Sequence, residues 1–314
     1  FLGLILSVIS CDQAKEKVKI NENNNEFITS VKYAKGFDVQ LYKGYTKLII
    51  KSPYPDAKQY QEFILVSDRK ADFEGSNKVY VPVKKMIATS TTHIPMIEIL
   101  DETNSLIGFP TTDYISSKKT VARVRNGEVK DLGNEQDFNT EVLISLQPDI
   151  MVAFSMGKSG KLYQNIEKNG IPVVFNGDWL EDSPLGRAEW IKFFGALFNK
   201  NEEADSIFKV IEQDYLEAKK IALQAKIKPT IMSGVLFKDK WNLPAGESFT
   251  AQLYKDANTD YLWKTSSGQG SLILSFESVF EKAKKADYWI GSGYYTTLEE
   301  LESANMHYQE FETY

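Results

Sequence analysis

The chain of 314 residues contains one cysteine, Cys11, and two histidines, His93 and His307. Zinc sites in proteins take three or four Cys, His or carboxylate ligands, so a histidine-rich zinc site is not expected. The sequence also has no Cys-x-x-Cys, His-Glu-x-x-His or Gly-x-Ser-x-Gly motif. Most nucleophile–base pairs of covalent catalysis therefore cannot be assembled, and we expect neither an enzyme nor an intrinsic metal or cofactor.

An excess of positive charge is absent as well. The 37 Lys and Arg residues are outnumbered by 43 Asp and Glu residues, which gives a formal net charge of −6 at pH 7. A protein that binds nucleic acid carries a basic face that neutralises phosphates, and this composition implies no such face. We therefore expect no nucleic-acid partner.

An apolar run, Phe1–Ser10, opens the chain; it is too short to span a bilayer but is typical of the core of a signal peptide. The adjoining Val8-Ile9-Ser10-Cys11 resembles the bacterial lipobox, whose cysteine receives a diacylglyceryl group and becomes the first residue after cleavage. Asp12–Glu26 is a polar, asparagine-rich tether. We expect residues 1–26 to be a lipoprotein signal and tether with Cys11 lipidated; the alternative is a buried free cysteine.

The chain starts without Met or a basic n-region, so we expect its first residues to be missing. Residues 27–83 contain short β segments separated by turn signals, which predict an antiparallel lead-in. From Lys85 onward, strands alternate with helices of about ten residues, the pattern of a parallel sheet covered by helices. The predicted strands of this part are Met86–Thr89, Leu106–Phe109, Ile150–Phe154 and Val173–Phe175. Asn126-Gly127 between alternating flanks predicts a hairpin over Val121–Leu132.

A long helical segment, residues 183–228, lies between two α/β parts. Ser183-Pro184 is a favourable helix start, and from Asn201 apolar residues recur in steps of three and four until Pro229. This second helix runs about 25 residues, or about 38 Å. It predicts a spine between an N-terminal lobe (27–182) and a C-terminal lobe (229–314); the alternative is a crossover helix inside one large domain.

The C-terminal lobe contains fewer strand candidates, and we expect it to be incomplete. Its predicted strands are Thr230–Phe237 and Tyr288–Gly291, and its predicted helices are Phe249–Asp256, Ser275–Ala286 and Leu298–Ser303.

Two helix starts, one in each lobe, share an anatomy. Asn139-Thr140-Glu141 and Ser275-Phe276-Glu277 each place a capping residue two positions before a glutamate, and each helix leads through an Asp into a strand. Taken singly, each glutamate is explained by the helix dipole, which is worth about 0.3–1 kcal/mol.

Together, four segments resemble the class III periplasmic binding proteins, which serve ABC importers of iron–siderophores, haem and cobalamin. The segments are Val81–Thr89, Asn139–Ile150, Gly186–Phe208 and Leu274–Ile290. The resemblance implies an α/β fold of two Rossmann-like lobes joined by a single long helix, preceded here by the antiparallel β lead-in. It also implies that ligand lies between the lobes and that a glutamate on each lobe, Glu141 and Glu277, docks on arginines of the permease.

The ligand expected from this resemblance is an iron or cobalt chelate. Loops at the strand ends supply the candidate ligand-binding residues, which are Thr92, His93, Tyr114, Phe154, Trp179, Trp241 and Tyr294. For each aromatic residue the alternative is core packing. His93 would ligate a haem iron or corrin cobalt, or else be a hydrogen-bonded loop histidine.

The resemblance further implies a monomer in the bacterial cell envelope, anchored through Cys11, facing the periplasm or exterior, with an ABC importer permease as partner. Two other functions stay open. One is a manganese- or zinc-ion binding protein, which needs about four N/O ligands in the cleft. The other is an envelope enzyme that uses the cleft carboxylates Asp113, Asp178 and Asp239.

Overall fold

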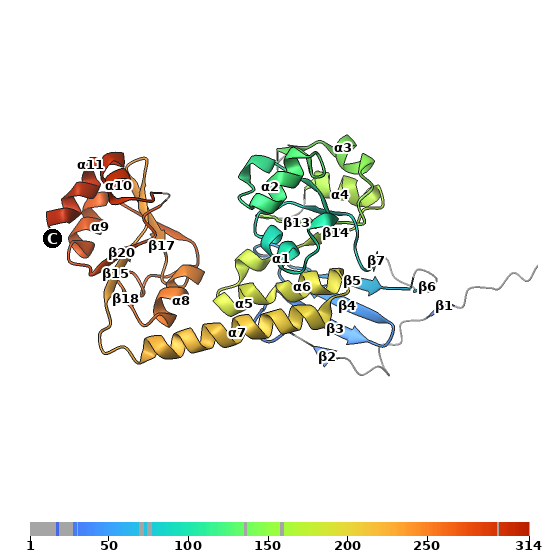
Figure 1. The fold of residues 1–314 in the computed structure, drawn as a ribbon, viewed down its shortest axis with the longest axis horizontal. Helices are drawn as coiled ribbons and strands as arrows, with labels where there is room; N and C mark the ends of the chain where they lie inside the picture. The colour runs from blue at the N-terminus through green and yellow to red at the C-terminus, as the bar shows by residue number, and fades with distance from the viewer. Residues whose placement is uncertain are drawn as a thin grey trace, which may run out of the picture.

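Two α/β lobes are joined by one long helix, α7 (Asn201–Leu223), which runs beneath both of them (Figure 1). The computed structural model describes residues 17–18, 28–29, 31–68, 72–73, 77–134, 137–157, 160–293 and 295–313. We call the described residues up to 182 the N-lobe and residues 229–313 the C-lobe. The predicted α/β architecture, with an antiparallel sheet at the start of the N-lobe, is confirmed.

A five-stranded parallel sheet forms the centre of the N-lobe. Its order is β10-β9-β8-β13-β14, with β10 (Lys130–Asp131), β9 (Leu106–Phe109), β8 (Met86–Ala88), β13 (Ile150–Ala153) and β14 (Val173–Phe175). The strands β8, β13 and β14 are buried along their whole length, because helices cover both faces of a parallel sheet. The chain builds outward from β8 on both sides, so the carboxyl ends of β8 and β13 flank the point at which the strand order reverses.

Four helices and three short 3-10 helices cover this sheet. The helices are α1 (His93–Ile99), α2 (Lys118–Arg125), α3 (Thr140–Ser145) and α4 (Lys161–Lys168), and the 3-10 helices are η2 (Thr103–Ser105), η3 (Thr112–Tyr114) and η4 (Asp178–Leu180). A further short antiparallel pair consists of β11 (Gly133–Asn134) and β12 (Asp137–Phe138).

The predicted hairpin over Val121–Leu132 is wrong. The segment begins inside α2, whose last residue is Arg125, and ends just after β10. The hydroxyl of Ser117 caps α2 by accepting a hydrogen bond from the N–H of Thr120. Asn126-Gly127 ends the helix instead of turning a hairpin, with Gly127 at φ +73°. Glycine favours this left-handed conformation just past a helix end as much as in a hairpin turn, so the dipeptide alone does not distinguish the two.

The antiparallel sheet of the N-lobe packs against the edge of the parallel sheet. Its strands, in order, are β2 (Ile28–Thr29), β3 (Phe37–Tyr42), β4 (Tyr45–Ile50), β5 (Gln61–Val66) and β7 (Lys78–Tyr80), of which only β5 and β7 pair in parallel. The side chain of Gln61 bridges to β14, because its amide donates to the carbonyl of Val173 (3.1 Å) and accepts from the N–H of Phe175 (2.9 Å). A separate short pair joins β1 (Lys17–Val18) and β6 (Asp72–Phe73).

The spine begins where it was predicted, at Ser183, whose hydroxyl accepts a hydrogen bond from the N–H of Gly186. Two short helices, α5 (Pro184–Glu189) and α6 (Ile191–Leu197), precede α7 and are largely buried in the main core of the N-lobe. The long helix is different, since only Ala204 and Phe208 of α7 are buried. Its first half packs on the N-lobe, and the rest extends toward the C-lobe (Figure 1).

Two buried carboxylates join the spine to the start of the antiparallel sheet. Glu189 accepts hydrogen bonds from the backbone N–H groups of residues 32–34. Glu181 accepts from the N–H groups of residues 35–36 and from the indole N–H of Trp190. Bonds from N–H donors to a carboxylate are charge-assisted and about twice as strong as neutral ones. The turn before β3 is therefore held against α5.

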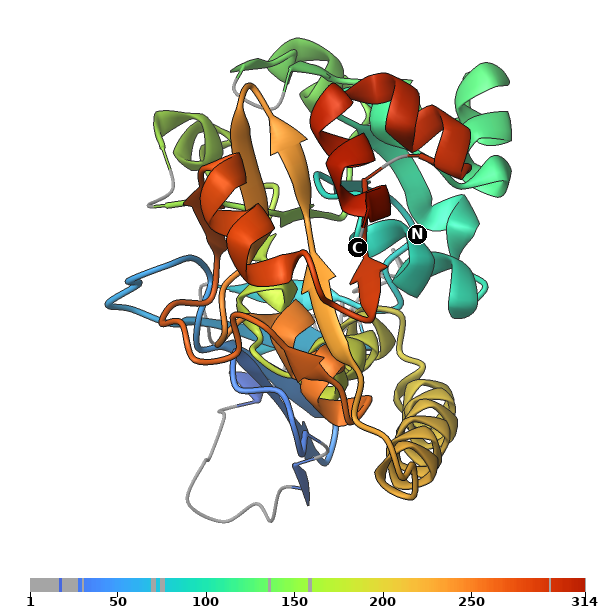
Figure 2. The ribbon, with the colours of Figure 1, turned by 90° about the vertical axis from the view of Figure 1, so that its left-hand side faces the viewer.

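The C-lobe combines a parallel and an antiparallel sheet, and Figure 2 shows it facing the viewer in front of the N-lobe. The parallel sheet has the order β18 (Asp260–Tyr261), β15 (Thr230–Ser233), β20 (Tyr288–Ile290). The antiparallel sheet has the order β16 (Val235–Phe237), β17 (Lys240–Pro244), β19 (Ser271–Leu274). Its helices are α8 (Phe249–Asp256), α9 (Phe276–Ala283), α10 (Leu298–Ala304) and α11 (Met306–Gln309), followed by η5 (Glu310–Thr313).

The predicted strand Thr230–Phe237 is two strands, and Gly234 separates them. This glycine has φ +89°, and a Cβ placed on it would lie 1.9 Å from the carbonyl oxygen of Asn242. The backbone of β17 thus passes so close that only glycine fits at this position. The chain leaves the parallel sheet there and enters the antiparallel one.

Corresponding aspartates, Asp149 and Asp287, follow the two helices that share an anatomy and directly precede the next strand. In the N-lobe, Asp149 accepts hydrogen bonds from the N–H groups of Lys84 and Lys85, just before β8. In the C-lobe, Asp287 accepts from the N–H and hydroxyl of Thr230, at the start of β15. Each aspartate therefore ties the start of its own strand to the start of the central strand. None of the helices in the described part of the chain has the length and apolarity needed to cross a bilayer.

Replacing the buried Glu189 by glutamine is expected to destabilise the protein by about 2–3 kcal/mol. Glutamine keeps the shape but loses the charge that accepts three N–H bonds and pairs with Lys192 at 3.0 Å. Urea unfolding measures the change. Glu217→Gln, in an exposed pair with Lys220, is the control and should change stability by less than about 0.5 kcal/mol. Equal losses in the two variants would contradict a special role of Glu189.

Candidate functional site

The candidate site lies at the carboxyl edge of the N-lobe sheet, where β8, β13 and β14 end. Open α/β sheets bind ligands in this position, at the point where the strand order reverses. The side chain of Thr89, directly after β8, accepts a hydrogen bond from the N–H of Phe154, directly after β13 (2.8 Å). The two loops that flank the reversal point are therefore tied together, which fixes the position of Phe154.

Phe154 and Trp179 form an aromatic pair at this edge, with ring centroids 5.5 Å apart and an interplanar angle of 56°. Both side chains are partly exposed. The indole N–H of Trp179 has no hydrogen-bond partner among the described residues, although the atom itself is buried. The backbone of Phe154 is held from the other side, where its carbonyl accepts from the hydroxyl of Tyr163 (3.2 Å). The pair therefore offers two partly exposed aromatic rings, tilted against each other, as apolar surface for a ligand.

A buried carboxylate, Asp178, lies beside this pair. Burial raises the pKa of Asp178, while hydrogen bonds from Thr92 and from the N–H of Trp179, and the charge of Arg187, act in the opposite direction. The nearby Glu181 adds to the increase. Thr92 itself is exposed and directly precedes α1, so it links the loop after β8 with the loop after β14.

Arg187 of α5 connects this edge to the C-lobe. Its guanidinium donates to the carbonyl of Trp179 (2.8 Å) and to the carbonyl of Glu181 (3.3 Å). The centre of the same group lies 3.9 Å from the ring centroid of Phe249, the first residue of α8. Burial lowers the pKa of Arg187, although the charges of Asp178 and Glu181 act in the opposite direction. A guanidinium is so basic that it stays protonated in proteins.

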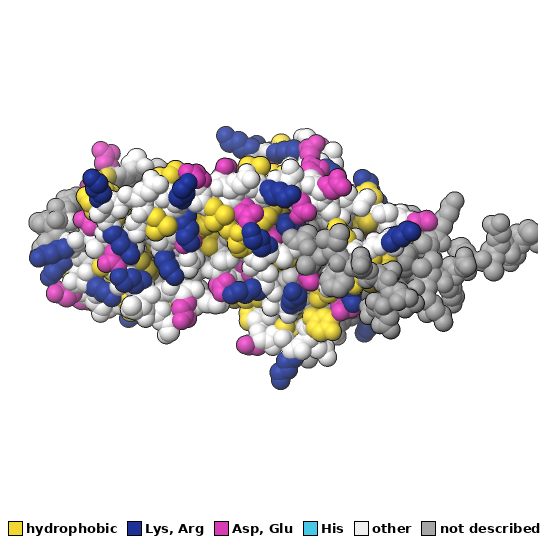
Figure 3. Space-filling view, turned by 90° about the horizontal axis from the view of Figure 1, so that it is seen from below, with side chains coloured by type: hydrophobic (Ala, Val, Ile, Leu, Met, Phe, Trp, Pro, Cys, Tyr) yellow, Lys and Arg dark blue, Asp and Glu magenta, His cyan; other side chains and the backbone are white. Residues whose placement is uncertain are grey.

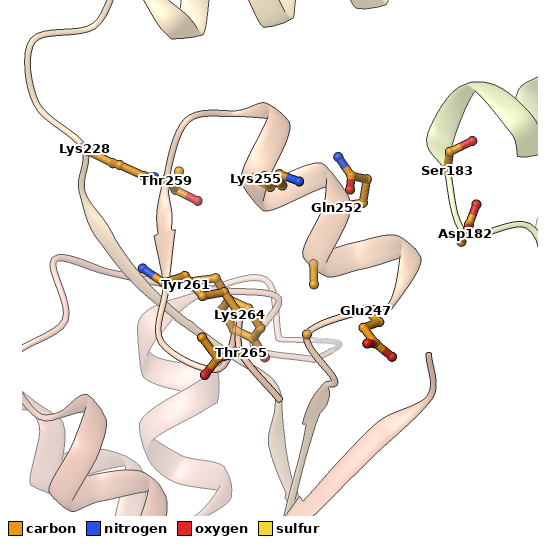
Figure 4. Close-up of a pocket in the computed structure, with 12 residues that line it drawn as sticks. Asp182, Ser183, Lys228, Glu247, Gln252, Lys255, Thr259, Tyr261, Lys264 and Thr265 are labelled. Atoms are coloured by element: carbon orange, nitrogen blue, oxygen red, sulfur yellow. The ribbon is translucent and has the colours of Figure 1, made fainter. Parts of the chain in front are cut away.

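A pocket of about 660 Å³ lies next to this contact and is lined from both lobes. Asp182 of the N-lobe and Ser183 at the start of the spine lie across an opening from Gln252 and Glu247 of the C-lobe (Figure 4). The remaining lining residues include Lys228, Lys255, Lys264, Thr259, Tyr261 and Thr265.

Seen from below, lysine and arginine side chains are interspersed with aspartate and glutamate, and hydrophobic side chains gather in the middle of the face (Figure 3).

Two of the predicted ligand-binding residues lie in the core, and the structure corrects both predictions. His93 is the first residue of α1 and is 0% exposed; its ring packs on Phe194, and neither ring nitrogen has a partner among the described residues. Burial lowers the pKa of His93 to about 3, so the ring is neutral. Trp241 is also 0% exposed, and its indole donates to the carbonyl of Ser233. The ring of Trp241 packs against other aromatic rings, such as that of Trp289, whose centroid lies 5.3 Å away. Trp241 therefore lies in the core of the C-lobe instead of facing the cleft.

The other predicted residues have different positions. Tyr114, in η3, is 68% exposed. Tyr294 and Cys11 lie outside the described residues. Sequence reasoning missed Arg187 and Phe249 as a contact between the lobes. The sequence pattern predicts only that Arg187 lies in a helix and that Phe249 begins another helix. Neither prediction indicates that the two side chains are in contact.

The two predicted docking residues, Glu141 and Glu277, are exposed in the first turns of α3 and α9. Each helix leads through a short connection into the strand after it and so runs antiparallel to that strand, which places its N-terminus at the carboxyl edge of the sheet. The predicted caps are confirmed: Asn139 accepts from the N–H of Val142, and Ser275 accepts from the N–H of Ser278. The pKa of Glu277 is lowered, first by its own backbone N–H and then by Ser275.

Comparison with known proteins decides the family. A model described as "Periplasmic binding protein" matches residues 86–312. The chain belongs to the periplasmic binding protein family. The antiparallel sheet before β8 lies outside the matched residues.

Relatives of this periplasmic binding protein include two uncharacterized lipoproteins of Methanocaldococcus jannaschii. One is 24% identical over 98% of this chain and 82% of its own length, and the other is 25% identical over 81% and 68%. Among solved structures, a possible iron-binding, periplasmic solute-binding protein of Staphylococcus epidermidis superposes with a TM-score of 0.57 at 15% identity, covering 73% of this chain and 85% of that one. A periplasmic haem-binding protein of Vibrio cholerae gives 0.56 at 14% identity, covering 73% and 88%. At such identities, these structures establish the fold.

The carboxylates considered for an enzyme come from three separate places. Asp113 is exposed in η3, Asp178 is buried in η4, and Asp239 is exposed in the turn between β16 and β17. Within the described ranges, no three His, Cys, Asp or Glu side chains gather in a way that could hold a metal ion.

Asp178→Asn is expected to stabilise the protein more at pH 7.5 than at pH 4.5. Since the folded-state pKa of Asp178 is raised, the folded protein binds more protons than the unfolded chain above about pH 3.9. The free energy of unfolding therefore decreases as the pH rises and Asp178 loses its proton in the folded protein. Asparagine does not ionise, so the variant does not undergo this decrease. Urea unfolding at the two pH values measures it.

Asp131→Asn is the control of opposite sign. The pKa of Asp131 is lowered, because bonds from the Thr112 hydroxyl and from the N–H groups of Gly133 and Thr112 outweigh its burial. This variant should lose stability at neutral pH and lose less as the pH falls toward the lowered pKa. The same pH dependence in both variants would contradict the assignment for Asp178.

Proposed function

We propose that this protein is the substrate-binding protein of an ABC importer, that it captures a bulky metal chelate, and that it delivers the chelate to the permease without catalysing a reaction. The candidate chelates are an iron–siderophore, haem and cobalamin. The observation that carries the proposal is the aromatic pair Phe154–Trp179 at the carboxyl edge of one lobe, which is connected to the other lobe through Arg187.

The chemistry of this surface fits a large planar or ring-shaped ligand better than a bare ion. Aromatic faces bury apolar ligand area, and the rings of Phe154 and Trp179 are both partly exposed. Thr92 and Tyr114 are exposed at neighbouring loops and add polar contacts at the rim. The metal in this proposal is part of the cargo, held by the chelator, and the protein supplies no metal ligand.

Glu141 and Glu277 are proposed as the two docking residues for the permease. Both are exposed in first turns of helices, one on each lobe, at the carboxyl edges of the sheets. Charges that face a partner act mainly on the association rate and on the register of the complex. A binding protein with one acidic residue on each lobe would engage the permease with both lobes together.

The location proposed is the cell envelope, with the protein monomeric and anchored through a lipid on Cys11. The lipobox-like segment before Cys11 and the lipoprotein relatives support the anchor. Since those relatives come from an archaeon, the proposal does not specify a bacterial envelope. A manganese- or zinc-binding protein and an envelope enzyme are not favoured by any contact in the described residues, where His93 is buried and the three cleft aspartates are dispersed.

Titration with haemin, cyanocobalamin and a ferric trihydroxamate chelate, followed by visible absorption, tests the binding function. One of the three should bind, and Trp179→Ala should weaken that binding about 10- to 150-fold, because an aromatic ring whose burial against the ligand contributes about 1.5–3 kcal/mol is lost. Tyr288→Ala is the control, since Tyr288 is 61% exposed at the start of β20. No binding of any chelate by the unaltered protein, or equal effects of the two variants, would contradict the proposal.

Glu141→Lys and Glu277→Lys together should reduce uptake of the ligand in cells at least about ten-fold while the affinity of the purified protein for the ligand stays the same. The reason is that reversed charges repel the arginines of the permease without touching the aromatic surface. Glu281→Lys, 79% exposed on the same helix as Glu277, is the matched control and should leave uptake unchanged. Loss of ligand affinity in the double variant would place both residues in the ligand site instead.

A further inference from the structure

One side-chain contact between the lobes has a geometry that sets it apart. The guanidinium centre of Arg187 lies 3.9 Å from the ring centroid of Phe249, close enough for the planar cation to stack on the ring. Arg187 is in α5, at the beginning of the spine, and Phe249 is the first residue of α8 in the C-lobe. The contact is therefore a direct link between the two lobes, separate from their covalent connection through α7.

Hydrogen bonds to the N-lobe hold the edge of the Arg187 guanidinium. The planar face of the group remains free to stack on the ring of Phe249. The guanidinium donates to the carbonyls of Trp179 (2.8 Å) and Glu181 (3.3 Å), two residues of the same short segment after β14. Such a fork is available to arginine and not to lysine. Since Trp179 is one of the two aromatic residues of the proposed ligand surface, the position of that surface and the position of Phe249 depend on one side chain.

At its other end, α8 is held by the long helix. Asp256, the last residue of α8, accepts hydrogen bonds from the hydroxyl of Tyr215 (2.7 Å) and the ammonium of Lys219 (2.7 Å), both on α7. Asn258, just beyond α8, donates to the carbonyl of Ala222 (3.1 Å). Phe249 and Asp256 are seven residues apart, or about 10 Å along a helix. One end of α8 is thus attached to the spine, and the other end rests on Arg187.

We infer that Arg187 is a positioning residue: it connects the ligand surface at Trp179 to the C-lobe through Phe249, and it thereby sets the distance between the lobes around the ligand. The C-lobe pivots at Asp256, where α8 meets α7, and the stack of Arg187 on Phe249 limits the pivot. The inference rests on the proposed function in one respect, namely that the ligand binds at Phe154 and Trp179. If the lobes are already at the distance they have around the bound ligand, binding costs less conformational entropy. The contact between Arg187 and Phe249 therefore favours binding.

The test measures the distance between the lobes and the affinity for ligand in the same set of variants. Spin labels on Lys118→Cys in α2 and Glu281→Cys in α9, both exposed positions, report the distance in the full chain with Cys11→Ser. The probes are haemin, cyanocobalamin and the ferric trihydroxamate chelate.

Phe249→Leu is the decisive variant, because leucine preserves the apolar contact and the helix but removes the ring face. It should broaden the distribution of distances between the lobes and weaken ligand binding about five-fold. Arg187→Ala should do the same, and combining the two should add no further broadening, since both remove one contact. Arg187→Lys, which retains the charge without the fork, should be intermediate. Lys282→Ala removes a cation–ring contact with Trp263 inside the C-lobe and should leave the distance unchanged.

An unchanged distance and an unchanged affinity in Phe249→Leu, with loss of affinity in Arg187→Ala, would overturn the inference, because Arg187 would then act only on Trp179. A different result separates the inference from the proposed function. If Phe249→Leu broadens the distances but the unaltered protein binds none of the three chelates, the contact between the lobes stands and the proposed function fails.

Discussion

Two buried carboxylates, Glu181 and Glu189, hold the first part of the spine against the start of the antiparallel sheet. Between them they accept hydrogen bonds from the backbone N–H groups of residues 32–36, and Glu181 also holds the indole of Trp190. Carboxylates in a core are stable only with this many donors. Because the bonds fix α5 against the antiparallel sheet, they also fix Arg187, which contacts the C-lobe.

Helix α8 carries contacts of the C-lobe with both α5 and α7. The C-lobe rests on α7 through Asp256 and on α5 through Phe249, and both residues belong to α8. A long helix attached to both lobes resists large hinge motion, while a contact through one short helix permits a small rotation. This arrangement is compatible with the proposed function, in which the lobes close slightly around a ligand and both face a permease.

Much of the site's framework could be predicted, and its details could not. The caps at Asn139, Ser183 and Ser275 follow from local chemistry, since a side-chain oxygen before a helix finds unpaired N–H groups whatever the rest of the fold does. The positions of His93 and Trp241 do not follow, because a residue at a strand or helix end faces either the cleft or the core depending on what packs against it. Neighbours from distant segments, such as Phe194 and Trp289, decided both cases.

The amino-acid sequence by itself determined the alternation of strands and helices, the long helix from Asn201, and the matching helix starts at Glu141 and Glu277. Each of these depends on residues within a few positions of one another, through hydrophobic period and capping. Only the tertiary structure decided that Asn126-Gly127 ends a helix, that Gly234 sends the chain from one sheet to another, and that Arg187 reaches Phe249. Those outcomes depend on backbone and side chains brought together from far apart in the chain, where no local pattern records the partner.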